Sequence, residues 1–316
     1  MAVIEPILKT SSRPRQFRKS QPPEVLVVAA ILLVAACLRL YALSRQSLWA
    51  DEGNSWMMAI RPLPQIATAA AADIHPPLYY YLLSLWSRMA GTSEAGLRSL
   101  SAVIGCFLVL VTYCWSKHLA GRSVAATSAA LAAVSPFAVY YSQEARAYIL
   151  VALLAATSTL ACSAYHHRRR KGLPALPAAI AYALLSAALL WTHYLGILVL
   201  ILHSLYAAVS LAQYPRPERV PRLRDWCLIQ GAAFLLYLPW LQTMARSAAA
   251  WPGISAQQPL SFYLTQALRL YTAGVASYSM SIWNWLALVP ALVGALLSWR
   301  RAPKHAAWML LVVYAL

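Results

Sequence analysis

The sequence has few acidic residues: only nine of its 316 residues are Asp or Glu, against 26 Lys and Arg, which gives a formal net charge of +17. Charged residues make up 11% of the chain and hydrophobic residues 61%, whereas roughly 25% of a soluble domain is charged. Several apolar runs approach the roughly 20 residues that cross a bilayer as a helix. Because lone strands cannot satisfy their backbones in lipid, the composition predicts an all-α polytopic membrane protein.

Common motifs for nucleotides, structural metals and disulfides are absent from the sequence. The five cysteines lack CxxC or zinc spacing, and their odd number argues against a disulfide framework. No Walker-type loop, GxGxxG or HExxH sequence occurs. The positive charge is explained more simply by basic cytoplasmic loops than by nucleic acid, so we expect no nucleic-acid partner.

Eight apolar runs are long enough to span a membrane, and a ninth begins near Ala306. The ninth is only about eleven residues long when the sequence stops at Leu316, too short to cross. We therefore expect a fragment or a truncated reading frame. The eight runs lie near 25–43, 98–116, 124–141, 147–165, 174–192, 195–213, 226–245 and 281–299.

The run 76–89, PPLYYYLLSLWSRM, is shorter and two-faced. If it lies flat at the interface, five basic clusters all fall on the cytoplasmic side: the amino tail, Lys117 with Arg122, and the stretches 166–171, 216–224 and 300–304. If it spans, every cluster after the first faces outward, against the positive-inside rule. We therefore predict an interfacial helix at 76–89, a basic cytoplasmic tail at 1–24, one membrane domain at 25–316 and a long outward loop at 247–279.

This topology places five of the nine acids on the outer face, two of them in LWADEGNSW, where the first span emerges. A lone acid there would often serve as a first-turn helix acid. Two adjacent carboxylates near lipid are less easily explained in that way, because ionisable groups at such positions are costly and tend to mark function. Asp51 and Glu52 are therefore the candidate catalytic residues.

Three further stretches place chemically active side chains on the same face. In DIHPPLYYYLL, Asp73 and His75 either cap a helix or take part in function. In YYSQEARAYIL, Glu144 and Arg146 either anchor helix ends or, for the arginine, hold a phosphate by bidentate hydrogen bonds. His193 in WTHYLG carries a weaker signal.

In this order, LWADEGNSW, DIHPPLYYYLL, YYSQEARAY and WTHYLG resemble the GT-C membrane glycosyltransferases. The nearest groups are families 39 and 83: the dolichyl-phosphate-mannose–protein mannosyltransferases, the lipid A aminoarabinose transferases and the lipopolysaccharide galacturonosyltransferase-like proteins. The resemblance runs from about Arg39 to Tyr194. It implies seven spans with interfacial helices in the first outward loop, a polyprenyl-phosphate-linked sugar donor and Asp51 as the catalytic base. His75 departs from the family, whose members often carry Lys before the two prolines.

The chemistry of sugar transfer agrees with this resemblance. A carboxylate must take the proton of the acceptor, which is a lipid, glycan or protein group, as the anomeric carbon is attacked. We expect Asp51 in that role, with Glu52 and Asp73 orienting Asp51 or the acceptor. Direct displacement inverts the anomeric centre.

Cations must stabilise the departing lipid phosphate. Arg146 is the leading candidate, and His75, His193 and Arg269 are weaker ones. We expect no obligatory cofactor, because a monophosphodiester has less charge to neutralise than a diphosphate. A divalent metal held by Asp51, Asp73, His75 or Glu144 is the alternative.

Two other classes of function stay open. A lipid or solute transporter could use the same acids as a relay, although transporters usually bind near the bilayer midplane and these span interiors hold almost no charge. An inactive membrane scaffold is the third reading. The Ala- and Arg-rich loops favour a bacterial inner membrane, with the active site on the extracytoplasmic side.

Overall fold

The computed structural model describes residues 23–73, 75–250 and 258–275, and all regular secondary structure in these ranges is helical. The predicted span 281–299, the start of the ninth run and most of the 1–24 tail lie outside the described residues. The helices are α1 (Glu24–Leu40), α2 (Ala50–Ala59), α3 (Leu63–Ala71), α4 (Leu78–Ala90), α5 (Glu94–Ala120), α6 (Arg122–Val134), α7 (Pro136–Ser142), α8 (Tyr148–Arg170), α9 (Leu176–Thr192), α10 (Gly196–Leu211), α11 (Arg216–Ala250) and α12 (Leu260–Ala273).

The seven runs predicted between residues 25 and 245 each coincide with a long helix or with the α6–α7 pair. By length and composition, α5, α8 and α11 can cross a membrane, and α6 with α7, bent by 58°, would make a fourth span. The helices α9 and α10 are apolar but shorter. The third predicted span is therefore a broken helix, because Ser135 and Pro136 interrupt it.

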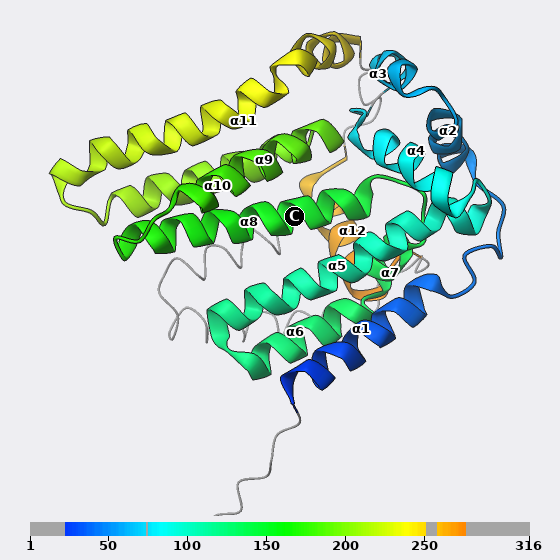
Figure 1. Cartoon of the computed structure of the whole chain (residues 1–316), viewed down its shortest axis with the longest axis horizontal. Coiled ribbons are helices and arrows are strands. Elements are labelled where there is room, and N and C mark those ends of the chain that lie inside the picture. Colours follow the sequence, from blue (N-terminus) through cyan, green and yellow to red (C-terminus); the bar gives the residue numbers. More distant parts are fainter. Residues whose placement is uncertain (1–22, 74, 251–257, 276–316) are drawn as a thin grey trace, which may run out of the picture.

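The long helices run beside one another, and α2, α3 and α4 gather at one end of the bundle (Figure 1). Helix α5 packs against α1, α6 and α8, and α9 packs against α8 and α11. Helix α4 lies between α2 and the start of α5. The segment predicted to be interfacial, 76–89, thus corresponds to a separate short helix at the end of the bundle, and its position in a membrane stays a prediction.

The turn between α4 and α5 fixes where α5 begins. Gly91 ends α4 with a φ of +80°, a conformation that favours glycine. The Ser93 hydroxyl then accepts a hydrogen bond from the backbone N–H of Gly96 at 3.2 Å. A Cβ at Gly96 would meet the carbonyl oxygen of Ala90 at 2.5 Å. This tight turn brings the first turns of α5 against α4.

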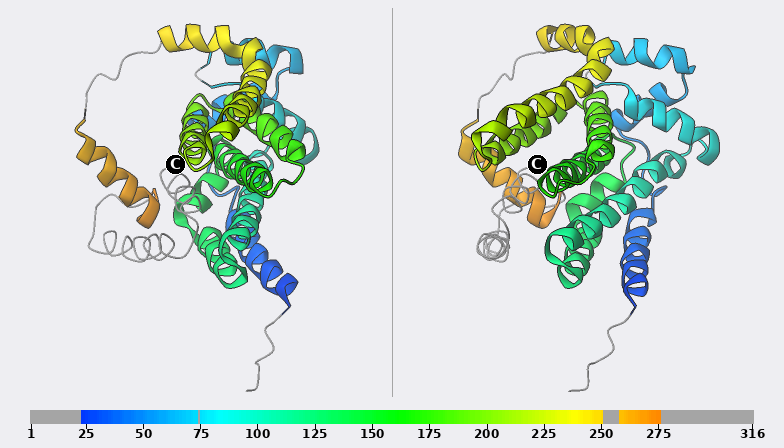
Figure 2. Two further views of the ribbon diagram at one scale, coloured as in Figure 1. Left: turned by 90° about the vertical axis from the view of Figure 1, so that its left-hand side faces the viewer. Right: turned by 60° about the vertical axis from the view of Figure 1, so that its left-hand side comes forward.

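The predicted outward loop at 247–279 is shorter at its start and partly helical. Helix α11 continues to Ala250, five residues beyond the predicted end of its span. Helix α12 then lies beside the main bundle and packs on α7 (Figure 2). Residues 251–257 and 276–279 of this loop lie outside the part of the chain that the structure describes.

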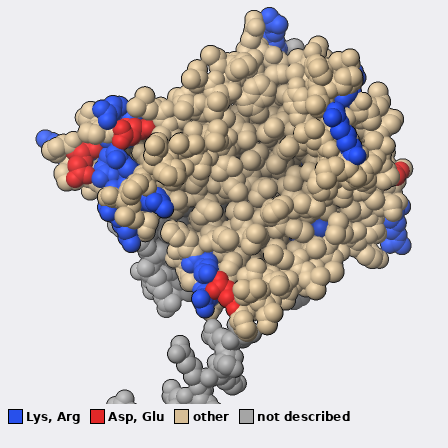
Figure 3. All heavy atoms as spheres, in the orientation of Figure 1, with Lys and Arg blue, Asp and Glu red and all other residues tan. Residues whose placement is uncertain are grey.

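Charged side chains gather at the ends of the helices and leave the side of the bundle largely uncharged (Figure 3). At the end far from α2–α4, Glu24 pairs with Lys117 and with Arg122, which ties the start of α1 to the turn between α5 and α6. At the same end Arg169 pairs with Asp225 at 2.5 Å and joins α8 to α11. Three of the predicted basic clusters therefore meet at one end of the molecule.

One arginine is fully buried within the bundle. Arg39, at the end of α1, has no exposed surface. Its Nη1 and Nη2 donate to the carbonyl oxygens of Ala133 and Ala132 at 2.8 and 3.1 Å, and its Nε donates to the Ser142 hydroxyl at 3.2 Å. These carbonyls belong to the last turn of α6, where the helix leaves them without backbone partners. Arg39 therefore fastens α1 to the bend between α6 and α7.

Replacing Arg39 by Met should lower the free energy of unfolding by about 2 kcal/mol, because three inter-helix hydrogen bonds are lost and each contributes roughly 0.6 kcal/mol within a membrane. Thermal unfolding in detergent measures the change. The control is Arg45→Met, a substitution at an exposed position five residues beyond α1. Equal melting temperatures for the two variants would contradict this role for Arg39.

Candidate active site

A buried ion pair lies at the centre of the cluster formed by the predicted site residues. Arg98, in the first turns of α5, donates from Nε to Oε1 of Glu52 at 2.8 Å and from Nη2 to Oε2 at 2.6 Å. Glu52 has no exposed surface, and Arg98 is 6% exposed. Such a bidentate arrangement is among the strongest hydrogen-bonded contacts between side chains.

Both members of this pair also form hydrogen bonds with backbone groups of neighbouring loops. The guanidinium of Arg98 also donates to the carbonyl oxygens of Leu43, Gln46 and Ser47 at 2.6–3.2 Å. Glu52 Oε1 also accepts from the backbone N–H of Ala145 at 2.8 Å, and Oε2 accepts from the N–H of Trp49 at 3.4 Å. The pair thus fixes the first turn of α2, the loop before it and the loop before α8.

Glu52 is therefore enclosed by protein and faces no open space. Of the two tasks expected for it, orienting the acceptor and orienting Asp51, this geometry favours the second. Sequence reasoning missed Arg98 as a site residue. The available signal was a single arginine at the head of an apolar run, where a buried cation needs an acid partner.

Asp51 precedes Glu52 in the same turn of α2. Its side chain is 45% exposed, while the side chain of Arg146 beside it is 6% exposed. Nη2 of Arg146 lies 3.4 Å from Asp51 Oδ2, and Nη1 donates to the backbone carbonyl of Asp51 at 3.2 Å. Nε of Arg146 is buried and has no partner among the described residues. The structure thus joins an accessible carboxylate to a buried cation that keeps an unused donor.

The two predicted histidines meet next to this pair. The rings of His75 and His193 lie edge to face with centroids 5.2 Å apart. Burial, together with the charge of Arg146, lowers the pKa of both rings, that of His75 to about 4. The backbone N–H of Leu195 donates to Nδ1 of His193 at 3.1 Å, which places the proton of the neutral ring on Nε2. Both rings are therefore neutral near pH 7.

Asp73 forms the side of the cluster nearest α2 and α4. Its Oδ2 accepts hydrogen bonds from the Tyr80 hydroxyl at 2.7 Å and from Asn54 Nδ2 at 3.3 Å. Burial raises the pKa of Tyr80, and the neighbouring Asp73 adds to this effect. Tyr80 therefore stays protonated and donates, so that Asp73 is held between two helices, and among the described residues no hydrogen bond to its Oδ1 is formed.

Glu144 is buried behind Asp51. Burial raises the pKa of its carboxyl, the nearby acids Glu52 and Asp51 act in the same direction, and a hydrogen bond with Tyr140 opposes them. Its carbonyl oxygen accepts from the backbone N–H of Arg146 at 2.8 Å. Glu144 thus lies in the turn that carries Arg146, and its side chain is buried.

Arg269 is placed apart from the other predicted residues. It lies on α12, which packs on α7, and its Nε donates to Gln266 Oε1 at 2.8 Å. In the described ranges, no hydrogen bond or ion pair joins it to Asp51, Asp73 or Arg146. The structure therefore brings together seven of the eight predicted site residues.

The cluster does not gather its candidate metal ligands into one set. Within residues 23–73, 75–250 and 258–275, no group of three His, Cys, Asp or Glu side chains is arranged to hold a metal ion. Asp51, Asp73 and Glu144 each have separate partners, and Nδ1 of His75 is buried without a hydrogen-bond partner among the described residues. The absence of an obligatory metal stays a prediction.

Comparisons with known proteins bear on this arrangement. Residues 74–214 match the family model of dolichyl-phosphate-mannose-protein mannosyltransferase, a little under half of the chain. ArnT from Cupriavidus metallidurans bound to undecaprenyl phosphate is similar over 92% of this chain and 53% of that one, with a TM-score of 0.61 and 15% identity. The Pmt1–Pmt2 complex of S. cerevisiae bound to the sugar donor is similar over 71% and 34%, with a TM-score of 0.58 and 18% identity.

The fold is that of the GT-C membrane glycosyltransferases. The archaeal oligosaccharyltransferase AglB from Archaeoglobus fulgidus, in complex with an inhibitory peptide and a dolichol-phosphate, is also similar, over 87% of this chain and 37% of that one, with a TM-score of 0.52 and 14% identity. A comparison with curated protein sequences gave no match. The resemblance drawn from the four short stretches and the all-α polytopic fold class are confirmed. The chain spans between about a third and about half of the length of these GT-C proteins.

Breaking the buried Glu52–Arg98 ion pair should lower the stability of the protein strongly. Glu52→Gln and Arg98→Met should each lower the free energy of unfolding by about 3–5 kcal/mol, because each leaves a buried charge without its partner. The double variant should lose less than the sum of the two. Unfolding of the four proteins in one detergent measures this coupling, with Glu94→Gln in the first turn of α5 as the control. Strictly additive losses would show that the two side chains do not act as a pair.

The lowered pKa of His75 predicts loss of stability in acid. The pKa of His75 is about 6.5 in the unfolded chain and about 4 in the folded one. Between these two pH values the unfolded chain binds a proton that the folded chain does not, so the protein becomes less stable as the pH falls through this range. The melting temperature of the parent should fall more steeply there than that of His75→Gln. The exposed His118→Gln variant should behave like the parent, and the same slope in all three proteins would refute the effect.

Proposed function

We propose that this protein is an integral membrane glycosyltransferase that moves a sugar from a polyprenyl-phosphate donor to a lipid, glycan or protein acceptor. The GT-C fold supports this proposal, as does the match of residues 74–214 to a mannosyltransferase family. The solved ArnT and AglB structures hold undecaprenyl phosphate and dolichol-phosphate respectively. The predicted topology places the reaction on the extracytoplasmic side, in a bacterial inner membrane.

The observation that carries the proposal is the exposed Asp51 carboxylate beside the buried Arg146 guanidinium. The acceptor oxygen or nitrogen attacks the anomeric carbon, and Asp51 takes the proton that this atom loses. The bond between the anomeric carbon and the phosphate oxygen breaks, and the phosphate keeps the electron pair. Attack from the side opposite the leaving group inverts the anomeric centre.

Arg146 supplies the positive charge for the departing phosphate. Its Nε is buried without a partner among the described residues, and a guanidinium can hold phosphate oxygens through two donors at once. A donor already fixed by the surrounding structure needs no reorganisation as charge develops on the leaving oxygen. The contact between Arg146 and Asp51 gives way when the phosphate arrives and frees the carboxylate to act as the base.

The histidines contribute hydrogen bonds rather than charge in this proposal. Both rings are neutral near pH 7, and Nε2 of His193 carries a proton. A neutral imidazole donates to a phosphate oxygen without placing a second cation next to Arg146. This accounts for a site in which histidine replaces the lysine common in the family, since a lysine there would lie close to Arg146.

The proposal predicts that Asp51→Asn lowers the rate of sugar transfer by at least about 10²-fold, because general-base catalysis contributes roughly 10²–10⁴. The purified protein is incubated with synthetic polyprenyl-phosphate sugars and a panel of acceptors, and the released polyprenyl phosphate is measured. The melting temperature of the variant should stay near that of the parent, because the Asp51 side chain is 45% exposed and asparagine has nearly the same shape.

The matched control is Glu218→Gln, which removes a half-exposed carboxylate at the other end of the bundle. It should transfer sugar at the parental rate. Transfer by Asp51→Asn at the rate of the parent would exclude Asp51 as the base. A folded parent that releases polyprenyl phosphate from none of the donors would contradict the enzyme and favour a transporter.

A further inference from the structure

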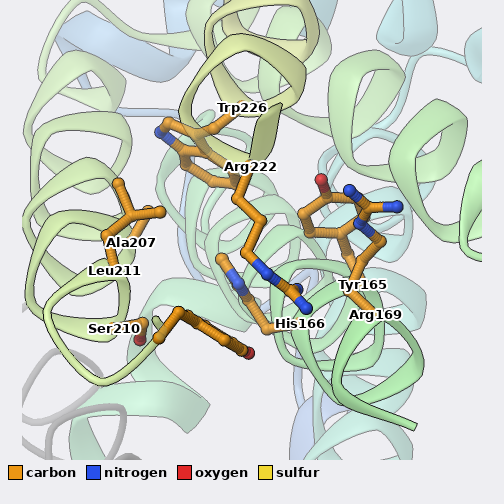
Figure 4. Close-up of a pocket in the computed structure, with 9 residues that line it drawn as sticks. Tyr165, His166, Arg169, Ala207, Ser210, Leu211, Arg222 and Trp226 are labelled. Carbon is orange, nitrogen blue, oxygen red and sulfur yellow. The ribbon is translucent and has the colours of Figure 1, made fainter. Parts of the chain in front are cut away.

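A cleft lies at the basic end of the bundle, far from Asp51, between the ends of α8 and α10 and the beginning of α11 (Figure 4). Its enclosed volume is about 20 Å³, room for roughly one water-sized group, and the cleft opens to the surface. None of the eight predicted site residues lines it, so the proposed sugar transfer leaves it unexplained.

Two arginines enter the cleft from different helices. Arg169 of α8 donates from Nη2 to Asp225 at 2.5 Å, while its Nε is buried and unpaired among the described residues. Arg222 of α11 donates from Nε and Nη2 to Glu218 at 3.1 and 2.8 Å. A guanidinium has five N–H donors, so both arginines keep donors for a further anion although each already has an acid partner.

Aromatic rings form the wall between the two arginines. Trp226 is 6% exposed, and its indole N–H is buried without an acceptor among the described residues. The rings of His166 and Tyr165 pack on it at 5.3 and 6.2 Å. On the open side, the Arg222 guanidinium lies 3.8 Å above the centre of the Tyr214 ring. The rings therefore form the apolar inner wall of the cleft, and the two guanidinium groups lie on the other side of Trp226 from its indole nitrogen (Figure 4).

The location of the cleft indicates which class of anion could bind there. It lies among the basic clusters 166–171 and 216–224, which the predicted topology places on the cytoplasmic side. Exposed apolar side chains lie along both flanking helices, among them Leu205 and Val209 on α10 and Leu228 on α11. Basic pockets between membrane helices on this side are suited to anionic lipid headgroups, and the apolar flanks suit acyl chains.

We propose that this cleft binds the phosphate of an anionic phospholipid headgroup. Arg169 and Arg222, whose side chains are 36% and 19% exposed, hold the phosphate oxygens at the mouth of the cleft. The bound lipid bridges α8 and α11, which Arg169 and Asp225 already join, and so stabilises this end of the bundle. The site is independent of the reaction proposed at Asp51.

The test titrates the purified chain, in micelles of a neutral detergent, with phosphatidylglycerol and follows the melting temperature. The parent should gain stability as the lipid is added, and Arg222→Gln should need at least about tenfold more lipid for half of this gain, because it loses charged hydrogen bonds. Phosphatidylcholine and inorganic phosphate serve as comparison probes and should stabilise much less.

The matched control is Arg224→Gln, which removes the same charge from the same helix at an exposed position outside the cleft. It should respond to phosphatidylglycerol like the parent. Equal weakening in both variants would show binding by diffuse surface charge and overturn the proposal. So would an equal response to phosphatidylcholine, or to inorganic phosphate, which would indicate a free-anion site.

Should Arg222→Gln fail to fold, the double variant Arg169→Gln/Asp225→Asn removes the other ligand without leaving a buried charge unpaired, because Arg224, which also contacts Asp225, is exposed. Its expected loss of lipid response is the same, and an unchanged response would overturn the proposal. Lipid binding is measured here without sugar transfer. A negative result in the lipid test therefore does not contradict the proposed sugar transfer, and a lack of sugar transfer does not contradict the lipid site.

Discussion

The buried ion pair between Glu52 and Arg98 is the constraint on which the outward cluster depends. Removing two charges from water is costly, and only good geometry with additional hydrogen bonds compensates for it. Here the carboxylate takes two bonds from the guanidinium and one from the N–H of Ala145. The guanidinium in turn binds three carbonyls of the loop before α2. Three segments distant in sequence are thereby fixed, and Asp51 is fixed with them.

The turn between α7 and α8 completes this arrangement, because consecutive residues in it hold different elements. Ser142 accepts from Arg39, and the Gln143 side chain donates to the carbonyls of Leu38 and Tyr41 at the end of α1. Ala145 then binds Glu52, and Arg146 reaches Asp51. The stretch YYSQEARAY therefore joins α1 and α2 to the start of α8, in addition to supplying Arg146 to the site. Arg146 owes its position to the residues that precede it.

The two ends of the bundle differ in chemistry. At one end acids and neutral histidines lie around two buried arginines, Arg98 and Arg146, and at the other arginines outnumber their acid partners. The interior between the two ends was expected to hold almost no charge, and Arg39 is the exception. It is bonded to carbonyls and a hydroxyl and has no ionisable partner among its hydrogen bonds. It therefore joins α1 to α6 and α7.

The sequence by itself determined the all-α class, the positions of seven long apolar helices and the stretches that carry the outward acids and histidines. Apolar length, charge bias and order along the chain are local properties, and they can be read without knowing which helices touch. Only the tertiary structure decided which acid is free. Asp51 and Glu52 are adjacent and chemically alike, yet the turn of α2 directs Glu52 into the bundle toward Arg98 and leaves Asp51 exposed beside Arg146. It also separated Arg269 from the cluster and brought His75 against His193, because such contacts depend on how distant helices pack.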